Sequence, residues 1–232
     1  LVPVFMEEVS MRSFSFWWKI CRPHHCVAAG LGAWIAVLLS DGHEWWSTVK
    51  LGAAFSLCLG CLGASIYHYG AANVMYARKY WDRVDVESPA LLACVGAFFL
   101  LLSVAVALIT LPHAATLVVV YNLVSVVCYA KFLAKHWTTK NLVISGVCVS
   151  PILVGWLSGH RLHPAVPYGI ITIFFGYWAR EIIKDIDDLE ANNGIRVTLP
   201  MRIGIPWAWR IAGGFASVSV LSLVALGPVI AR

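Results

Sequence analysis

The chain has 232 residues, of which 60% are apolar and 12% are charged, and its formal net charge is +5. Soluble domains carry about 25% charged residues, so this composition excludes an ordinary soluble domain and indicates a protein whose solvent is the bilayer. The segment from Ser88 to Ala130 contains no Asp, Glu, Lys or Arg. At about 1.5 Å per helical residue, this segment can cross a hydrocarbon core of about 30 Å twice, so it predicts a helical hairpin.

The first segment, residues 1–22, mixes large apolar side chains with charged ones. Phe14, Trp17 and Trp18 stand among charged residues such as Arg12 and Lys19. This pattern is typical of an amphipathic helix that lies in the membrane interface. We therefore expect an amphipathic N-terminal helix at 1–22, followed by a single transmembrane helical domain at 23–232.

Seven uncharged stretches follow, and each of them predicts one membrane span. They are separated by charged residues or by Pro112, Pro164 and Pro167. Each span must be helical, because an open strand would leave backbone donors and acceptors unsatisfied in hydrocarbon. The predicted fold class is therefore all-α, a polytopic transmembrane helical bundle. The seven spans are 24–40, 51–77, 88–111, 113–130, 141–160, 162–179 and 211–231.

The Lys and Arg residues are distributed unevenly between the two sides of this bundle. Fourteen of the 17 lie on one side, within 12–22, 78–83, 131–140 and 180–210. By the positive-inside rule that side is cytoplasmic, so we expect an integral, multi-pass membrane protein whose N-terminus, with the helix at 1–22, is cytoplasmic. The same rule accounts for the net positive charge without a nucleic-acid partner.

Eight of the twelve carboxylates fall into two clusters, both at the predicted cytoplasmic ends of spans. A charge near the membrane centre costs about 2.5–3.5 kcal/mol on insertion scales and is normally retained for a function, so the positions of the carboxylates are informative. The first cluster is Asp82, Asp85 and Glu87; the second is Glu181, Asp185, Asp187, Asp188 and Glu190.

The second cluster has helical spacing. Glu181, Asp185, Asp188 and Asn192 are four, three and four residues apart, so they share one face if the sixth span continues as a helix. A divalent cation would neutralise such a row, and Mg²⁺ favours one or two carboxylates together with phosphate oxygens. The alternative is a solvated helix end whose acids pair with neighbouring bases, and the spacing leaves both open.

The sequence around this cluster reads A-R-E-I-I-K-D-I-D-D-L-E at 179–190, then T-L-P at 198–200, with Arg202 and Gly204 after it. It resembles the second motif of the UbiA superfamily of intramembrane prenyltransferases, R-E-x-x-K-D-x-x-D-x-E-x-D followed by T-L-P. Two further stretches are similar to that family in order and spacing. Arg22-Pro23-His24 leads into the first span, and Lys135 precedes Asn141 between the fourth and fifth spans.

The chain departs from the family pattern in its first motif. The family form N-D-x-x-D-x-x-x-D should fall at 73–85, where Asp82 and Asp85 are three residues apart instead of four. The last Asp of the second motif is Asn192 here, which can coordinate a metal through its carbonyl but brings no charge. The seven predicted spans compare with nine that are usual in the family.

The resemblance implies a site in which Mg²⁺ holds an allylic diphosphate that ionises and is attacked by an acceptor. Metals and cationic side chains stabilise the charge on the leaving diphosphate. The expected metal ligands are Asp82, Asp85, Glu181, Asp185, Asp188 and Asn192, and the expected catalytic residues are Asp185, Asp188 and Lys135. The expected diphosphate-binding residues are Arg22, Arg78, Lys79, Lys131, Arg180 and Lys184, for which positive-inside topology alone is the alternative explanation.

The expected function is Mg²⁺-dependent transfer of a prenyl group from an allylic isoprenyl diphosphate to an aromatic or lipid acceptor within the membrane. The partners are then the diphosphate, a hydrophobic acceptor and membrane lipid. The alternative is a catalytically degenerate UbiA-fold subunit of a larger membrane complex that binds an isoprenoid lipid, a quinone or a pigment. The altered first motif and Asn192 favour that alternative, because each removes charge from the metal site.

Overall fold

The computed structural model describes residues 17–18, 20–41, 47–75, 89–131, 136–159, 163–193 and 197–230. Its regular elements in these ranges are all helices. Seven of them are long, and each overlaps one of the seven predicted stretches, so the all-α prediction is confirmed. The long helices are α2 (Pro23–Asp41), α3 (Thr48–Met75), α4 (Pro89–Thr110), α5 (His113–Lys131), α6 (Trp137–Ser158), α7 (Ala165–Asp187) and α10 (Ile205–Ile230); the short α8 (Leu189–Asn192) and α9 (Leu199–Ile203) lie between α7 and α10.

Five of the described helices are long and apolar enough to cross a membrane. Their candidate spans are Pro23–Ser40, Thr48–Ala71, Pro89–Thr110, Trp137–Ser158 and Ile205–Val229. The apolar part of α5, His113–Tyr129, is shorter, and α7 carries charged residues in its last two turns. Five spans are thus supported by length and hydropathy, and the number seven stays a prediction.

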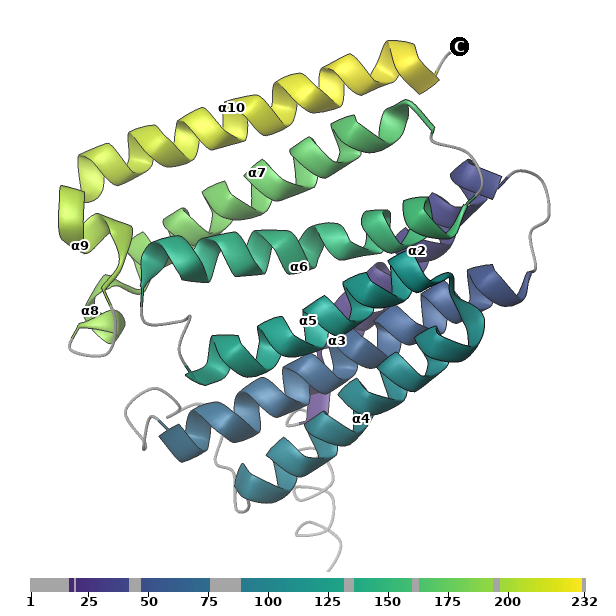
Figure 1. Ribbon diagram of the computed structural model, residues 1–232. Coiled ribbons are helices and arrows are strands. Elements are labelled where there is room, and N and C mark those ends of the chain that lie inside the picture. Colours follow the sequence, from purple (N-terminus) through teal and green to yellow (C-terminus); the bar gives the residue numbers. More distant parts are fainter. Residues whose placement is uncertain are drawn as a thin grey trace, which may run out of the picture.

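The long helices lie side by side, with α4 and α10 at opposite edges of the bundle (Figure 1). α3 packs against α4, α2 packs against α3 and α6, and α7 lies between α6 and α10. Large apolar side chains are exposed at both edges, such as Ile109 on α4 and Leu221 on α10. Such exposed apolar side chains are expected when lipid, rather than water, surrounds the bundle.

Small residues allow α3 and α4 to pack with their backbones close together. A Cβ atom on Gly70 would collide with the backbone of Ala93, and one on Gly96 would collide with the backbone of Tyr67. The hydroxyl of Ser56 donates to the carbonyl of Ser103 at 3.0 Å, and the hydroxyl of Ser103 donates back to the carbonyl of Ser56 at 2.7 Å. Close packing and interhelical hydrogen bonds are the interactions that join helices in lipid, where the hydrophobic effect contributes little.

One end of the bundle gathers the elements that the sequence analysis marked for function. The end of α7, the short helices α8 and α9, and the beginning of α6 meet there (Figure 1). α3 ends and α4 begins at this same end. The first acidic cluster, with Asp82 and Asp85, belongs to the segment that links α3 to α4 in the sequence, and this segment is outside the described residues. Also outside them are Arg78, Lys79, Lys135, the side chain of Lys131 and most of the predicted helix at 1–22.

Candidate active site

The acidic row, which we define as Glu181, Asp185, Asp188 and Asn192, begins with Glu181 and Asp185 on the last two turns of α7. The first part of this helix, up to Ala179, is apolar, and the charged residues begin at Arg180. Carboxylates near the C-terminus of a helix are unfavourable, because the helix dipole places partial negative charge there. Glu181 and Asp185 are nevertheless buried. Their burial therefore requires cations from nearby.

The helix that carries the row is interrupted at one residue. The expected continuous helix ends at Asp187, and Asp188 forms the C-cap, its N–H donating to the carbonyls of Lys184 and Ile186. The helical conformation resumes in α8, where the N–H of Asn192 donates to the carbonyl of Asp188 at 2.9 Å. Glu181, Asp185 and Asn192 are buried and Asp188 is half-buried, so these four residues stay on the interior side across the break.

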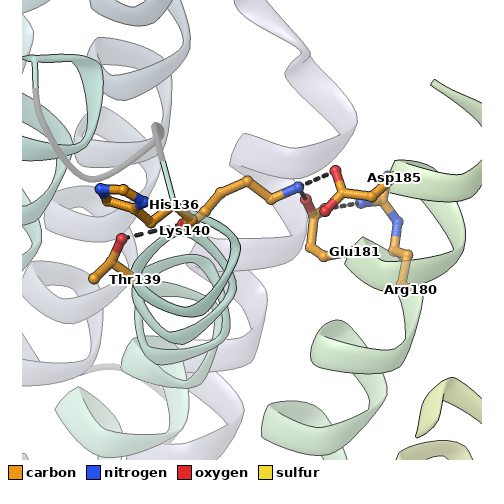
Figure 2. Close-up of polar contacts among 6 residues, drawn as sticks. All are labelled: His136, Thr139, Lys140, Arg180, Glu181 and Asp185. Carbon is orange, nitrogen blue, oxygen red and sulfur yellow. Dashed lines mark hydrogen bonds and ion pairs between the residues drawn. The ribbon is translucent and has the colours of Figure 1, made fainter. Parts of the chain in front are cut away.

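A lysine from the neighbouring helix supplies the main counter-charge. Lys140 lies in the first turn of α6, and its side chain is only 1% exposed. Its Nζ donates a hydrogen bond to Oδ1 of Asp185 and lies 3.5 Å from Oε2 of Glu181. Figure 2 shows the Lys140 side chain reaching from α6 to both carboxylates of α7. One buried ammonium thus binds two buried carboxylates.

A second cation approaches Glu181 from the surface. Nη1 of Arg180 donates to Oε1 of Glu181 at 2.7 Å, and the Arg180 side chain is 59% exposed (Figure 2). Glu181 therefore stands between a buried ammonium and a solvated guanidinium. An exposed ion pair of this kind stabilises little, whereas removal of one partner from a buried pair is costly. Lys140 is the cation on which the buried carboxylates depend.

Other polar side chains at this end are buried and contain atoms without a hydrogen-bond partner among the described residues. Asn141, which follows Lys140, and Thr198, which precedes α9, are both fully buried. Both amide atoms of Asn141 and the hydroxyl of Thr198 lack a hydrogen-bond partner within the part of the chain that the structure describes. Buried polar groups are normally paired, so these groups are candidates for contact with a ligand.

The T-L-P segment of the second motif packs α9 against α7. Leu199 and Pro200 are buried, and Leu199 belongs to a core cluster with Ile182 of α7 and Ala208 of α10. The preceding residue, Val197, forms a β-bridge with His136, directly before α6. This part of the motif therefore holds α6, α7 and α10 together around the acidic row.

Of the remaining predicted bases, the structure describes the side chains of Arg22 and Lys184. The guanidinium of Arg22 donates to the hydroxyl of Tyr69 on α3 at 3.2 Å and lies 5.6 Å from the centre of its ring. Lys184 is exposed on α7. Sequence reasoning assigned Lys140 to positive-inside topology and missed its contact with the acidic row. The available signal was its position directly before Asn141, a residue already matched to the family.

The donor set suits Mg²⁺ that arrives with a phosphate ligand. Among the described residues, no three His, Cys, Asp or Glu side chains converge to hold a metal by themselves. Two buried carboxylates, Glu181 and Asp185, do stand on one helix face. Mg²⁺ prefers oxygen ligands and usually takes one or two carboxylates together with substrate phosphates and water. The residues present therefore fit a metal shared with a diphosphate better than a closed metal centre.

Fold and site together define an integral membrane helical bundle with a buried, cation-paired acidic row at one end. Curated relatives are digeranylgeranylglyceryl phosphate synthases. The one from Methanoregula boonei is 30% identical over 192 residues, or 80% of this chain and 67% of that protein. Those from Haloquadratum walsbyi and Natronomonas pharaonis are 27% and 29% identical over 71% and 88% of this chain. The chain spans 62% of the first of these two proteins and 74% of the second.

Solved structures show the same fold. A structure of digeranylgeranylglyceryl phosphate synthase superposes with a TM-score of 0.73 at 20% identity, covering 91% of this chain and 76% of that one. A UbiA homologue from Archaeoglobus fulgidus, bound to DMAPP and Mg²⁺, superposes with a TM-score of 0.70 at 14% identity, covering 91% of this chain and 77% of that one. No family model matches the chain. The chain belongs to the UbiA superfamily of intramembrane prenyltransferases.

Proposed function

We propose that the protein transfers a prenyl group from an allylic isoprenyl diphosphate to a hydrophobic acceptor within the membrane, with Mg²⁺ as cofactor. The observation that carries the proposal is a pair of buried carboxylates on α7, Glu181 and Asp185. They lie at one end of a UbiA-type membrane bundle. Burying two acids in a membrane protein is costly, so their retention indicates a function. Similar solved structures hold DMAPP or GPP together with Mg²⁺.

The residues of the row would divide the work as follows. Glu181, Asp185, Asp188 and Asn192 would hold the metal from α7 and α8, together with Asp82 and Asp85, which lie outside the described residues. When bound, Mg²⁺ would stabilise the negative charge that develops on the leaving diphosphate. The basic residues would bind the diphosphate oxygens directly. These bases are Arg78, Lys79, Lys131, Lys135, Arg180 and Lys184.

The acceptor we propose to test first is a prenylated glyceryl phosphate. The curated relatives are named for a product with two geranylgeranyl chains on glyceryl phosphate. This name favours a lipid acceptor over an aromatic one and geranylgeranyl diphosphate as the donor. Arg22 is left out of the proposed diphosphate site, because its guanidinium is engaged with Tyr69 on α3.

The proposed topology has seven spans with the acidic row in the cytoplasm and the N-terminal helix, 1–22, on the same side. Its support is the seven long helices and the excess of Lys and Arg at the end where α7 finishes. A protease site inserted after Glu44 should be cut only from outside, and one inserted after Gly194 only from the cytoplasm. The reverse pattern would overturn the orientation.

The decisive test is turnover with geranylgeranyl diphosphate, geranylgeranylglyceryl phosphate and Mg²⁺ in the detergent-purified protein. Asp185→Asn and Asp188→Asn should each reduce turnover by about 100-fold or more, the usual cost of removing a group that stabilises a developing charge. Asp187→Asn is the matched control, because Asp187 is exposed on the same turn and should be almost neutral. Equal turnover in all four proteins would contradict the proposal.

A second candidate function is favoured by one observation. Lys140 pairs with both Glu181 and Asp185, and Arg180 pairs with Glu181, so two cations already balance the two carboxylates without a metal. A non-catalytic UbiA-fold subunit that binds an isoprenoid lipid within a larger membrane complex would need no more than this. Purification in a stoichiometric complex, with bound isoprenoid lipid and with no turnover under any metal, would identify that function.

A further inference from the structure

We propose that Lys140 is a built-in counter-ion that competes with the divalent cation for Asp185 and Glu181, so that metal binding at α7 displaces its ammonium group. This inference rests on the proposed function, since it concerns the same acidic row. It explains how the two buried carboxylates are stabilised before any substrate arrives. It also assigns a role to a residue that lies outside the motifs of the family resemblance.

The geometry places Lys140 on the same two carboxylates that a divalent cation would use. The Nζ of Lys140 donates to Oδ1 of Asp185 and lies 3.5 Å from Oε2 of Glu181. A divalent cation bound by the same two carboxylates would lie close to the ammonium and would repel it. The two positive groups therefore compete for the pair, and binding of the more highly charged metal would push the ammonium away.

The position of Lys140 shows that it is placed for this pairing. A cation in the first turn of a helix is unfavourable, because the N-terminus carries partial positive charge. The first turn of α6 nevertheless contains Lys140 with its side chain almost completely buried. The carboxylates of α7 must more than offset both costs. The only other described cation on the pair is Arg180, which is mostly exposed and contacts Glu181 alone.

Displacement of Lys140 would couple the metal to the diphosphate. A metal that arrives alone leaves a buried ammonium without its carboxylates, and that is unfavourable. A diphosphate that arrives with the metal brings oxygens to which the ammonium can donate. Lys140 would then weaken binding of the metal alone and leave binding of the metal–diphosphate much less affected, which is positive coupling between the two ligands.

The test is direct binding of Mn²⁺, followed by electron paramagnetic resonance of the free ion, to the detergent-purified protein without diphosphate. Lys140→Gln and Lys140→Met should bind Mn²⁺ on the order of tenfold more tightly than the wild type, within the usual range of coupled binding. Lys140→Arg keeps the charge and should stay close to the wild type. Arg202→Gln removes a positive charge from an exposed position on α9 and should change little.

The outcomes distinguish failure of the counter-ion role from failure of the proposed prenyl transfer. Equal Mn²⁺ affinity in the wild type, Lys140→Gln and Lys140→Met, with turnover intact in the wild type, would overturn the counter-ion role and leave the proposed function standing. No Mn²⁺ binding in folded Lys140→Gln and no turnover in the wild type would overturn both. Tighter binding in the two neutral variants alone is the result we expect.

A measurement on the wild type keeps the test valid if the neutral variants fail to fold. A buried, ion-paired Lys140 should react slowly with an amine-acylating reagent, as read by mass spectrometry of the modified residue. Saturating Mn²⁺ should accelerate its modification while leaving that of exposed Lys184 unchanged. An unchanged rate at Lys140 with Mn²⁺ bound would contradict displacement.

Discussion

Lys140 and Asp185, 45 residues apart in the sequence, form a buried ion pair between the first turn of α6 and the last turns of α7 (Figure 2). Their side chains are 1% and 0% exposed. This contact joins the two helices at the end of the bundle where the proposed chemistry takes place. It also places a positive and a negative charge where neither would be stable alone.

The first prediction concerns the stability that this pair confers. Asp185→Asn should destabilise the protein by about 3 kcal/mol, because it leaves the Lys140 ammonium buried and only partly compensated. Lys140→Met should cost a similar amount for the converse reason. The double variant should cost clearly less than the sum, with a coupling energy of about 1 kcal/mol or more. Unfolding of the four proteins in the same detergent gives this cycle, and simple additivity would show that the two charges do not interact.

The second prediction contrasts the two cations on Glu181. Arg180→Gln should lower the unfolding free energy by less than about 1 kcal/mol, because the Arg180 side chain is mostly solvated. Lys140→Gln should cost several times more, since its side chain is buried against the same carboxylate. Both are measured by unfolding at low and high salt. Only the Arg180 contribution should shrink as salt rises.

The sequence predicted the helices well because their signal is local. Each long uncharged stretch overlaps one helix, and the short apolar runs between Pro112 and Ala130 and after Pro164 became α5 and α7. The interruption at Asp188 was not predicted, since helical spacing continues through it and nothing in the local sequence marks a break. α8 restores the spacing, so Asn192 still lies on the interior side.

The sequence predicted the carboxylates of the site on α7 but not the lysine that pairs with them. The α7 carboxylates could be found because their spacing and flanking residues form a recognisable motif. Lys140 was missed, although it directly precedes the matched Asn141, because a lysine at the end of a span is common and its partners lie on another helix. The contact depends on how α6 and α7 pack, and packing is a property of the whole fold. Arg22 was matched by motif, and its described contact is with Tyr69 on α3.

The third prediction restores the missing charge of the second motif. Asn192→Asp should tighten Mn²⁺ binding, because it adds a carboxylate to a buried position on the same interior side as Asp185. Without metal the same variant should be less stable than the wild type, since a further buried charge has to be neutralised. Mn²⁺ titration and thermal unfolding with and without metal check both halves. A variant that loses stability without binding metal more tightly would place Asn192 outside the metal site.

The last prediction concerns the packing of α3 on α4, away from the charged end. Gly96→Ala should destabilise the bundle by about 1–3 kcal/mol, because a Cβ there collides with the backbone of Tyr67 and the two helices must separate. Gly213→Ala on α10 is the matched control, since its Cβ would meet nothing within 4 Å. That control should be neutral or slightly stabilising, because Ala favours a helix over Gly by about 1 kcal/mol. Thermal unfolding of the purified proteins measures both, and equal stability of the two variants would show that α3 and α4 are not held by close backbone contact.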